Sequence, residues 1–177
     1  ILFTQDHTCT LINQQAAHER ILYEKFIQQR ADKKAATQPS LFPTTLSLNP
    51  TDASLLEELL EDLTAVGFLI QKTSAHDFQI QGIPAGFENG KEESLLEAVL
   101  EEYKNFNAGL SLSLHEKLCR SLAKQQAIKT GTQLSEREMK QLITDLFACK
   151  EPYLSPFGAP TFRTLKKEEV EQLLLNR

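Results

Sequence analysis

The chain has 177 residues, of which 41% are hydrophobic and 24% are charged, and its formal net charge is −5. This composition is typical of a folded globular chain that is long enough for one domain or two small ones. No apolar run approaches the roughly 20 residues of a membrane helix, and a negative net charge excludes a surface that is basic throughout. Three widely spaced cysteines form no CxxC pair and predict no disulfide framework, which is typical of a reducing compartment.

Charge is distributed unevenly along the chain. Residues 1–50 carry a net charge of +1, residues 51–114 a net charge of −9, and residues 115–177 a net charge of +3. An acidic middle between two mildly basic ends indicates a subdomain inserted into another, although a chance clustering of acidic helix faces would give the same totals. The chain opens on Ile1 rather than Met, and we therefore expect it to be a piece of a longer protein.

Hydrophobic periodicity predicts an alternation of short strands and amphipathic helices. Prolines at positions 39 and 43 exclude helix there and predict an extended loop. Ser113 with Glu116, and Ser135 with Glu138, have the spacing of capping boxes and mark two helix starts. The expected elements, in chain order, are strands over residues 1–4 and 8–13, a helix over 14–30, a strand over 44–48, a helix over 50–66, strands over 68–72 and 78–83, helices over 92–106 and 113–130, a helix from 135, a strand over 161–165 and a helix over 166–175. The predicted class is α/β with mixed sheets and flanking helices, not a run of βαβ units.

The first predicted helix carries a motif. Residues 13–24 read Asn-Gln-Gln-Ala-Ala-His-Glu-Arg-Ile-Leu-Tyr-Glu. This run resembles the signature Asp-Gln-His-Ala-x-x-Glu-x-x-x-x-Glu of the C-terminal dimerisation domain of MutL, a DNA mismatch repair protein. Gln14, Ala16, Glu19 and Glu24 match it.

Two further elements follow in the family's order. Leu118-Cys119-Arg120 resembles its Ala-Cys-Arg element, and residues 155–160 resemble its Cys-Pro-His-Gly-Arg-Pro element, so the resemblance covers nearly the whole chain. It implies two subdomains. An outer dimerisation subdomain would comprise residues 1–45 plus 131–177, and an inner regulatory subdomain would comprise residues 46–130, which include the whole acidic middle.

In family members with nuclease activity, these elements form a metal site that nicks DNA. The seven corresponding positions here are Asn13, Gln15, Glu19, Glu24, Cys119, Ser155 and Phe157. Four of the seven depart from the family's ligands, since amide, hydroxyl and phenyl groups replace carboxylate, imidazole and thiol. The remaining thiol and two carboxylates are a thin ligand set for zinc. We therefore predict a vestigial site with no catalytic residue, no metal and no cofactor.

Other interpretations of these residues stay open. Glu19 and Glu24 would then lie on a solvated helix face, and Cys119 would pack as a small apolar side chain. The functional alternative is a divergent metal-dependent endonuclease using zinc or manganese, with His18 or His7 replacing a lost ligand.

The predicted loop has its own motif. Residues 38–43 read Gln-Pro-Ser-Leu-Phe-Pro and resemble the short motif by which MutL proteins bind the sliding clamp of replication. Gln38 offers an amide for polar contacts, Leu41 and Phe42 are apolar anchors, and Pro43 limits the conformations that must be ordered on binding. Alternatively, Leu41 and Phe42 begin a core strand.

Basic residues of the last third of the chain either face DNA phosphates or form a solvated surface. They are Lys117, Arg120, Lys124, Lys129, Lys140, Lys150, Arg163, Lys166 and Lys167. The chain contains no GxGxxG or GxxxxGK[ST] phosphate loop, no GxSxG elbow and no HExxH motif. The resemblance therefore places the family's ATPase in a region that precedes this chain.

The resemblance implies a homodimeric scaffold in DNA mismatch repair. Its expected partners are the mismatch-recognition protein MutS, the sliding clamp, and strand-nicking and helicase proteins, with weak DNA contact and no membrane contact. The expected location is the bacterial cytoplasm, in association with the nucleoid.

Overall fold

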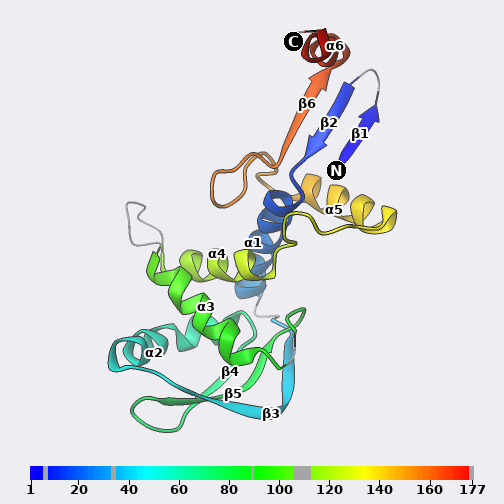
Figure 1. Cartoon of the computed structure of the whole chain (residues 1–177). Helices are drawn as coiled ribbons and strands as arrows, with labels where there is room; N and C mark the ends of the chain where they lie inside the picture. The colour runs from blue at the N-terminus through cyan, green and yellow to red at the C-terminus, as the bar shows by residue number, and fades with distance from the viewer. Residues whose placement is uncertain (6–7, 33–34, 89, 106–112, 176–177) are drawn as a thin grey trace. The chain divides into compact units, whose positions relative to one another are not determined.

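The computed structural model describes residues 1–5, 8–32, 35–88, 90–105 and 113–175 (Figure 1). Within these ranges the chain forms six helices and two three-stranded sheets, and every strand pairing is antiparallel. The predicted α/β class with flanking helices is confirmed. None of the helices in the described ranges combines the length and hydropathy needed to cross a bilayer.

The observed elements follow the predicted order. The helices are α1 (Gln14–Asp32), α2 (Pro50–Ala65), α3 (Glu92–Asn105), α4 (Leu114–Gln126), α5 (Glu136–Ala148) and α6 (Lys167–Leu175). The strands are β1 (Leu2–Gln5), β2 (Thr8–Ile12), β3 (Thr37–Ser47), β4 (Leu69–Lys72), β5 (Asp77–Pro84) and β6 (Phe162–Lys166).

The chain divides into two compact units. We call Ile1–Glu24 with Ala127–Arg177 the terminal unit, and Lys25–Gln126 the central unit. Their bounds differ from those of the predicted subdomains, which change at residue 45 and at residue 130. Part of the larger difference arises because residues 37–39 and 44–45, which were assigned to the outer subdomain, pair with β5 and so belong to the sheet of the central unit.

The terminal unit is built on the sheet β1-β2-β6. One face of this sheet packs against α1 and α5 through a buried cluster of Ile12, Ala17, Leu142 and Leu146. The capping box at the start of α5 is present, since the Ser135 hydroxyl accepts from the Glu138 backbone N–H and the Glu138 carboxylate accepts from the Ser135 N–H. Partly buried hydrophobic residues complete the cluster: Ile1, Phe3, Ile21, Ile128, Leu134, Ile143 and Phe162.

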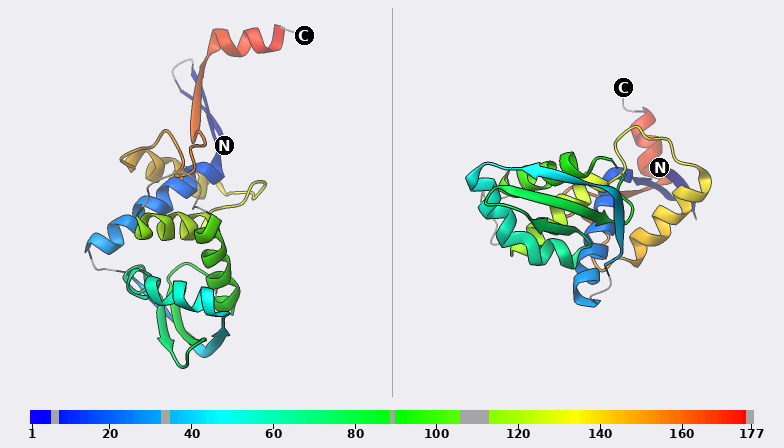
Figure 2. Two further views of the ribbon diagram at one scale, coloured as in Figure 1. Left: turned by 90° about the vertical axis from the view of Figure 1, so that its left-hand side faces the viewer. Right: turned by 90° about the horizontal axis from the view of Figure 1, so that it is seen from below.

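The central unit is built on the sheet β3-β5-β4, with α2 and α3 packed on its strands and α4 packed on these two helices. In the right-hand view of Figure 2 the strands of this sheet lie in front of its helices. The predicted apolar stripe of α2 is buried at Leu56, Leu59 and Leu63. Gly67 ends the helical run with φ 105°, and a Cβ there would lie 2.9 Å from the Ala36 carbonyl oxygen, so glycine is required.

Helix α4 ends at Gln126, four residues before the predicted end. The chain beyond it bonds to α1 instead of continuing as helix. The Ile128 backbone N–H donates to His18 Nδ1 at 3.0 Å, and the Thr130 hydroxyl donates to Gln15 Oε1 at 2.8 Å. These partners are more than a hundred residues away in sequence, so local periodicity carries no sign of them.

Candidate functional site

The first group of predicted site residues lies at the start of α1. The Asn13 side-chain oxygen accepts from the Ala16 backbone N–H at 3.2 Å, as a helix cap does. The Gln15 amide group donates to Glu19 Oε1 at 3.1 Å, and Glu19 is buried. Asn13 and Gln15, which replace Asp and His of the family pattern, thus both have hydrogen-bond partners within the chain. The Gln15 amide also occupies one oxygen of the Glu19 carboxylate, which a metal ion would need as a ligand.

Glu24 lies nine residues beyond Gln15 on the same helix. Its carboxylate binds the segment that follows α5. Its two carboxylate oxygens accept the backbone N–H groups of Lys150, at 2.8 Å, and of Glu151, at 3.1 Å. The buried Arg20 guanidinium lies 3.7 Å from the same carboxylate, and its Nε donates to the Leu154 carbonyl at 2.6 Å. The interpretation of Glu24 as a solvated residue is wrong, because this carboxylate and Arg20 hold a distant loop.

Ser155 lies within that loop and is buried. Its hydroxyl oxygen accepts from the backbone N–H groups of Phe157 and Ala159, both at 3.2 Å, and its own N–H donates to the Ala159 carbonyl at 2.7 Å. The residue that replaces the family's cysteine therefore closes a turn. Phe157 stands within this turn and supplies no ligand atom.

Cys119 belongs to the central unit, whereas the other six positions belong to the terminal unit. It is fully buried on α4, with Sγ 3.3 Å from His115 Nε2, and His115 Nδ1 lies 3.5 Å from Asp62 Oδ1. Sequence analysis missed this arrangement, although His115 and Cys119 are four residues apart and so share a helix face.

The metal-ligating side chains of the described residues form no group of three or more that could hold an ion. His18, one suggested replacement ligand, uses Nδ1 to accept from the Ile128 N–H. His7, the other, lies outside the described residues. Asn13, Gln15 and Ser155 each make hydrogen bonds within the chain through their side-chain oxygens.

The predicted clamp-binding motif forms a wide bulge in β3. Residues 37–39 pair with β5 as far as Pro39 opposite Gly82, and pairing resumes with Thr44 opposite Ile80. The four residues 40–43 therefore lie opposite one residue of β5. We call residues 40–43 the docking bulge.

The two apolar side chains of the docking bulge point into solvent. Leu41 is 90% exposed and Phe42 is 86% exposed. The alternative that they begin a core strand is wrong, because they contribute nothing to the core. Gln38 lies next to the bulge, opposite Ile83, and Pro43 is exposed at its end. Large apolar side chains exposed together on a constrained segment are typical of a recognition element.

One face of the terminal sheet carries exposed leucines beside the exposed Arg163, which lies opposite Leu11. Leu2 lies opposite Leu11, and these side chains are 62% and 41% exposed. Cys9, opposite Leu165, is on the same face, because alternate residues of a strand share a face. The opposite face carries Phe3, Ile12 and Phe162, which pack in the core. We call the surface formed by Leu2, Cys9, Leu11 and Leu165 the open sheet face.

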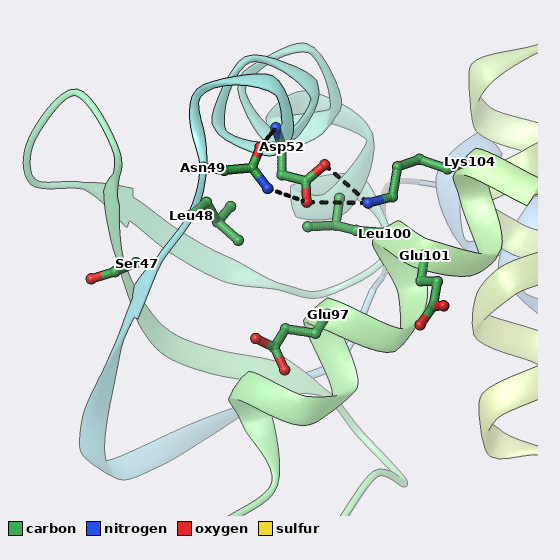
Figure 3. A pocket seen from close by; sticks show the side chains of 8 residues that line it. All are labelled: Ser47, Leu48, Asn49, Asp52, Glu97, Leu100, Glu101 and Lys104. Carbon is green, nitrogen blue, oxygen red and sulfur yellow. Dashed lines mark hydrogen bonds and ion pairs between the residues drawn. The ribbon is translucent and has the colours of Figure 1, made fainter.

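A cavity of about 380 Å³ lies in the central unit between α3 and the start of α2 (Figure 3). Lys104 bridges both carboxylate oxygens of Asp52, at 3.0 and 3.1 Å. The carboxylates of Glu97 and Glu101 also face the cavity. It includes none of the predicted site residues. The complete lining is Ser47, Leu48, Asn49, Asp52, Glu97, Leu100, Glu101 and Lys104.

Several of the basic residues proposed to face DNA have partners within the chain. Lys124 pairs with Glu102 at 2.7 Å, Lys140 with Glu136 at 2.6 Å, and the Lys117 ammonium lies 5.7 Å from the centre of the Tyr103 ring. Such pairing reduces the charge available to phosphates. The Lys167 side chain lies outside the part of the chain that the structure describes.

Comparisons with known proteins agree with the motifs. Residues 1–134 match the family described as the MutL C terminal dimerisation domain. The chain is 34% identical over 162 residues to DNA mismatch repair protein MutL of Flavobacterium johnsoniae, covering 92% of this chain and 25% of that protein. It is 34% identical over 163 residues to the protein of the same name from Chlorobaculum tepidum, covering 92% and 26%. The chain thus spans about a quarter of the length of these relatives.

Proposed function

The chain belongs to the family of MutL C-terminal dimerisation domains, and we propose that it is the homodimeric scaffold of a bacterial DNA mismatch repair protein. The family match over most of the chain is the observation that carries this proposal. The scaffold couples mismatch recognition by MutS to strand-nicking and helicase partners, and upstream ATPase regions of the complete protein close around DNA. Its place of action is the bacterial cytoplasm, at the nucleoid.

We assign the dimer contact to the open sheet face. Leu2 and Leu11 are neighbouring leucines on a sheet whose other face is already packed. A two-fold dimer requires one self-complementary patch, and an apolar sheet face meets this need because each copy buries the same residues.

The domain acts without a nuclease centre of its own. Support comes from Gln15, which donates to Glu19, and from Ser155, which accepts two backbone N–H groups. DNA contact is weak, because intramolecular pairing engages part of the basic surface. The alternative, a divergent endonuclease, requires manganese- or zinc-dependent nicking of supercoiled plasmid by this chain, and such nicking would contradict the proposal.

The docking bulge is proposed to bind the replication sliding clamp. Leu41 and Phe42 supply two exposed apolar anchors, and both ends of the bulge are held by the pairing of β3 with β5. A closed bulge has fewer conformations than a free peptide, so less entropy is lost when a groove receives it.

Replacing both anchors tests the docking proposal. We expect Leu41→Ala with Phe42→Ala to weaken binding to purified bacterial sliding clamp by at least about thirtyfold, because apolar anchors dominate small interfaces. Isothermal titration calorimetry measures the affinity, and circular dichroism checks the fold. Leu69→Ala, at a half-exposed leucine on β4 of the same unit, is the matched control and leaves the affinity unchanged. Equal affinities of the double variant and the control would refute docking through the bulge.

A further inference from the structure

Within the described residues, a side-chain hydrogen bond links the docking bulge to the body of the central unit. Ser40 is the first bulge residue, and its hydroxyl donates to Glu92 Oε1 at 2.9 Å. The other three bulge residues, Leu41, Phe42 and Pro43, have no polar side-chain atoms. Because Leu41 and Phe42 are almost fully exposed, packing does not hold them in place. The conformation of the bulge therefore depends on its strand ends and on the bond between Ser40 and Glu92.

Glu92 is an unusually fixed acceptor for this bond. It is the first residue of α3 and is only 5% exposed. Hydrogen bonds from its own backbone N–H and from that of Gly90, together with the Ser40 hydroxyl, lower the pKa of the carboxyl below its ordinary 4.5, against the opposing effect of burial. The positive end of the helix dipole also favours a carboxylate here. Glu92 is thus a buried, hydrogen-bonded acceptor that is ionised at neutral pH.

We propose that Ser40 and Glu92 are positioning residues that hold the docking bulge in the conformation that its partner receives. Glu92 makes no contact with the partner and acts through Ser40. The inference rests on the proposed docking of the bulge on the sliding clamp. Because Ser40 is bonded to the first residue of α3, the bulge is already ordered in the free protein, and less conformational entropy is lost when the partner binds.

The test variants change Ser40 and Glu92 and leave both apolar anchors in place. In the 177-residue chain, Ser40→Ala and Glu92→Gln each weaken clamp binding about fivefold to tenfold, because a charge-assisted hydrogen bond is lost or weakened and the bulge must be ordered on binding. The double variant is no weaker than Ser40→Ala, since both changes remove the same bond. Glu93→Gln, at the exposed neighbouring glutamate, changes the same charge in the same helical turn and leaves the affinity unchanged.

A linear peptide of residues 36–45 separates positioning from direct contact, because it contains Ser40 but not Glu92. Calorimetry of this peptide with purified sliding clamp is expected to give equal affinities for the natural sequence and the Ser40→Ala peptide. An equal loss in the peptide and in the chain would show that Ser40 touches the clamp and would overturn the proposal. Additive losses in the double variant, or an equal loss in Glu93→Gln, would also overturn it. If instead the chain with Leu41→Ala and Phe42→Ala binds normally, the docking itself is wrong.

Discussion

At the scale of single residues, three of the positions predicted to be vestigial make structural hydrogen bonds. Gln15 links Glu19 to Thr130, Glu24 holds the backbone after α5, and Ser155 closes the turn that follows. Buried polar atoms require hydrogen-bond partners, and at these positions other protein groups supply them.

Glu24 provides the clearest test of this structural role. Glu24→Ala removes the acceptor of two backbone N–H groups and one of the two carboxylates near the buried Arg20, the other being that of Glu151 at 3.6 Å. We expect the free energy of unfolding to fall by about 0.5–1.5 kcal/mol, the net contribution of a hydrogen bond whose donor water can reach. Urea denaturation followed by circular dichroism measures the change.

The matched control replaces a glutamate that holds no backbone group. Glu136 pairs with Lys140 on the exposed surface of α5, and Glu136→Ala is expected to change the free energy of unfolding by less than about 0.5 kcal/mol. If the two variants were equally stable, the assigned role of Glu24 would be wrong.

At the scale of elements, starts of helices were more predictable than ends. Both capping boxes are present as predicted: Ser135 with Glu138 opens α5, and Ser113 with Glu116 opens α4. A cap is local, since its donors and acceptors lie three residues apart. The end of α4 depends instead on bonds to α1, and it was therefore misplaced.

The capping box of α5 predicts a pH dependence of stability. Hydrogen bonds from the Ser135 hydroxyl and backbone N–H lower the pKa of Glu138 below its ordinary 4.5. A carboxyl whose pKa is lowered in the folded state stabilises that state above its unfolded pKa, and this contribution is lost as the pH falls through the folded value. We therefore expect Glu138→Gln to reduce the free energy of unfolding at pH 7 but to match the unaltered chain in acid.

Denaturation curves at pH 7, 5 and 3 measure this difference. The gap between the two proteins should be constant from pH 7 to pH 5 and should shrink toward pH 3. Glu136→Gln, in the same helical turn without a capping bond, serves as the control. A gap that grew on acidification would contradict the assigned bonds.

At the scale of the whole molecule, the two proposed interaction surfaces lie on different compact units. The open sheet face belongs to the terminal unit, and the docking bulge belongs to the central unit. The proposed self-association and the proposed clamp docking thus involve surfaces of different units, and we expect variants of one surface to leave the other function unaffected.

The dimer contact is tested by placing a charge on the open sheet face. Leu11→Asp would place two carboxylates in the contact, and because Arg163 lies opposite position 11 and offsets part of this charge, we expect the dimer dissociation constant to rise by about tenfold or more. Sedimentation velocity over a range of concentrations measures this. Leu154→Asp, at a similarly exposed leucine of the same unit outside that face, should remain dimeric. A dimeric Leu11→Asp protein would exclude this face as the contact.

The sequence by itself determined the family, the fold class and nearly every helix and strand, because periodicity, caps and short motifs operate within a few residues. It also marked residues 38–43 and the seven vestigial positions. The tertiary structure decided what these residues do. Glu24 meets Lys150, Arg20 meets Leu154 and Ser40 meets Glu92 across 126, 134 and 52 residues. Only folding creates such contacts, and only burial distinguishes a leucine in the core from one, such as Leu41, that faces solvent.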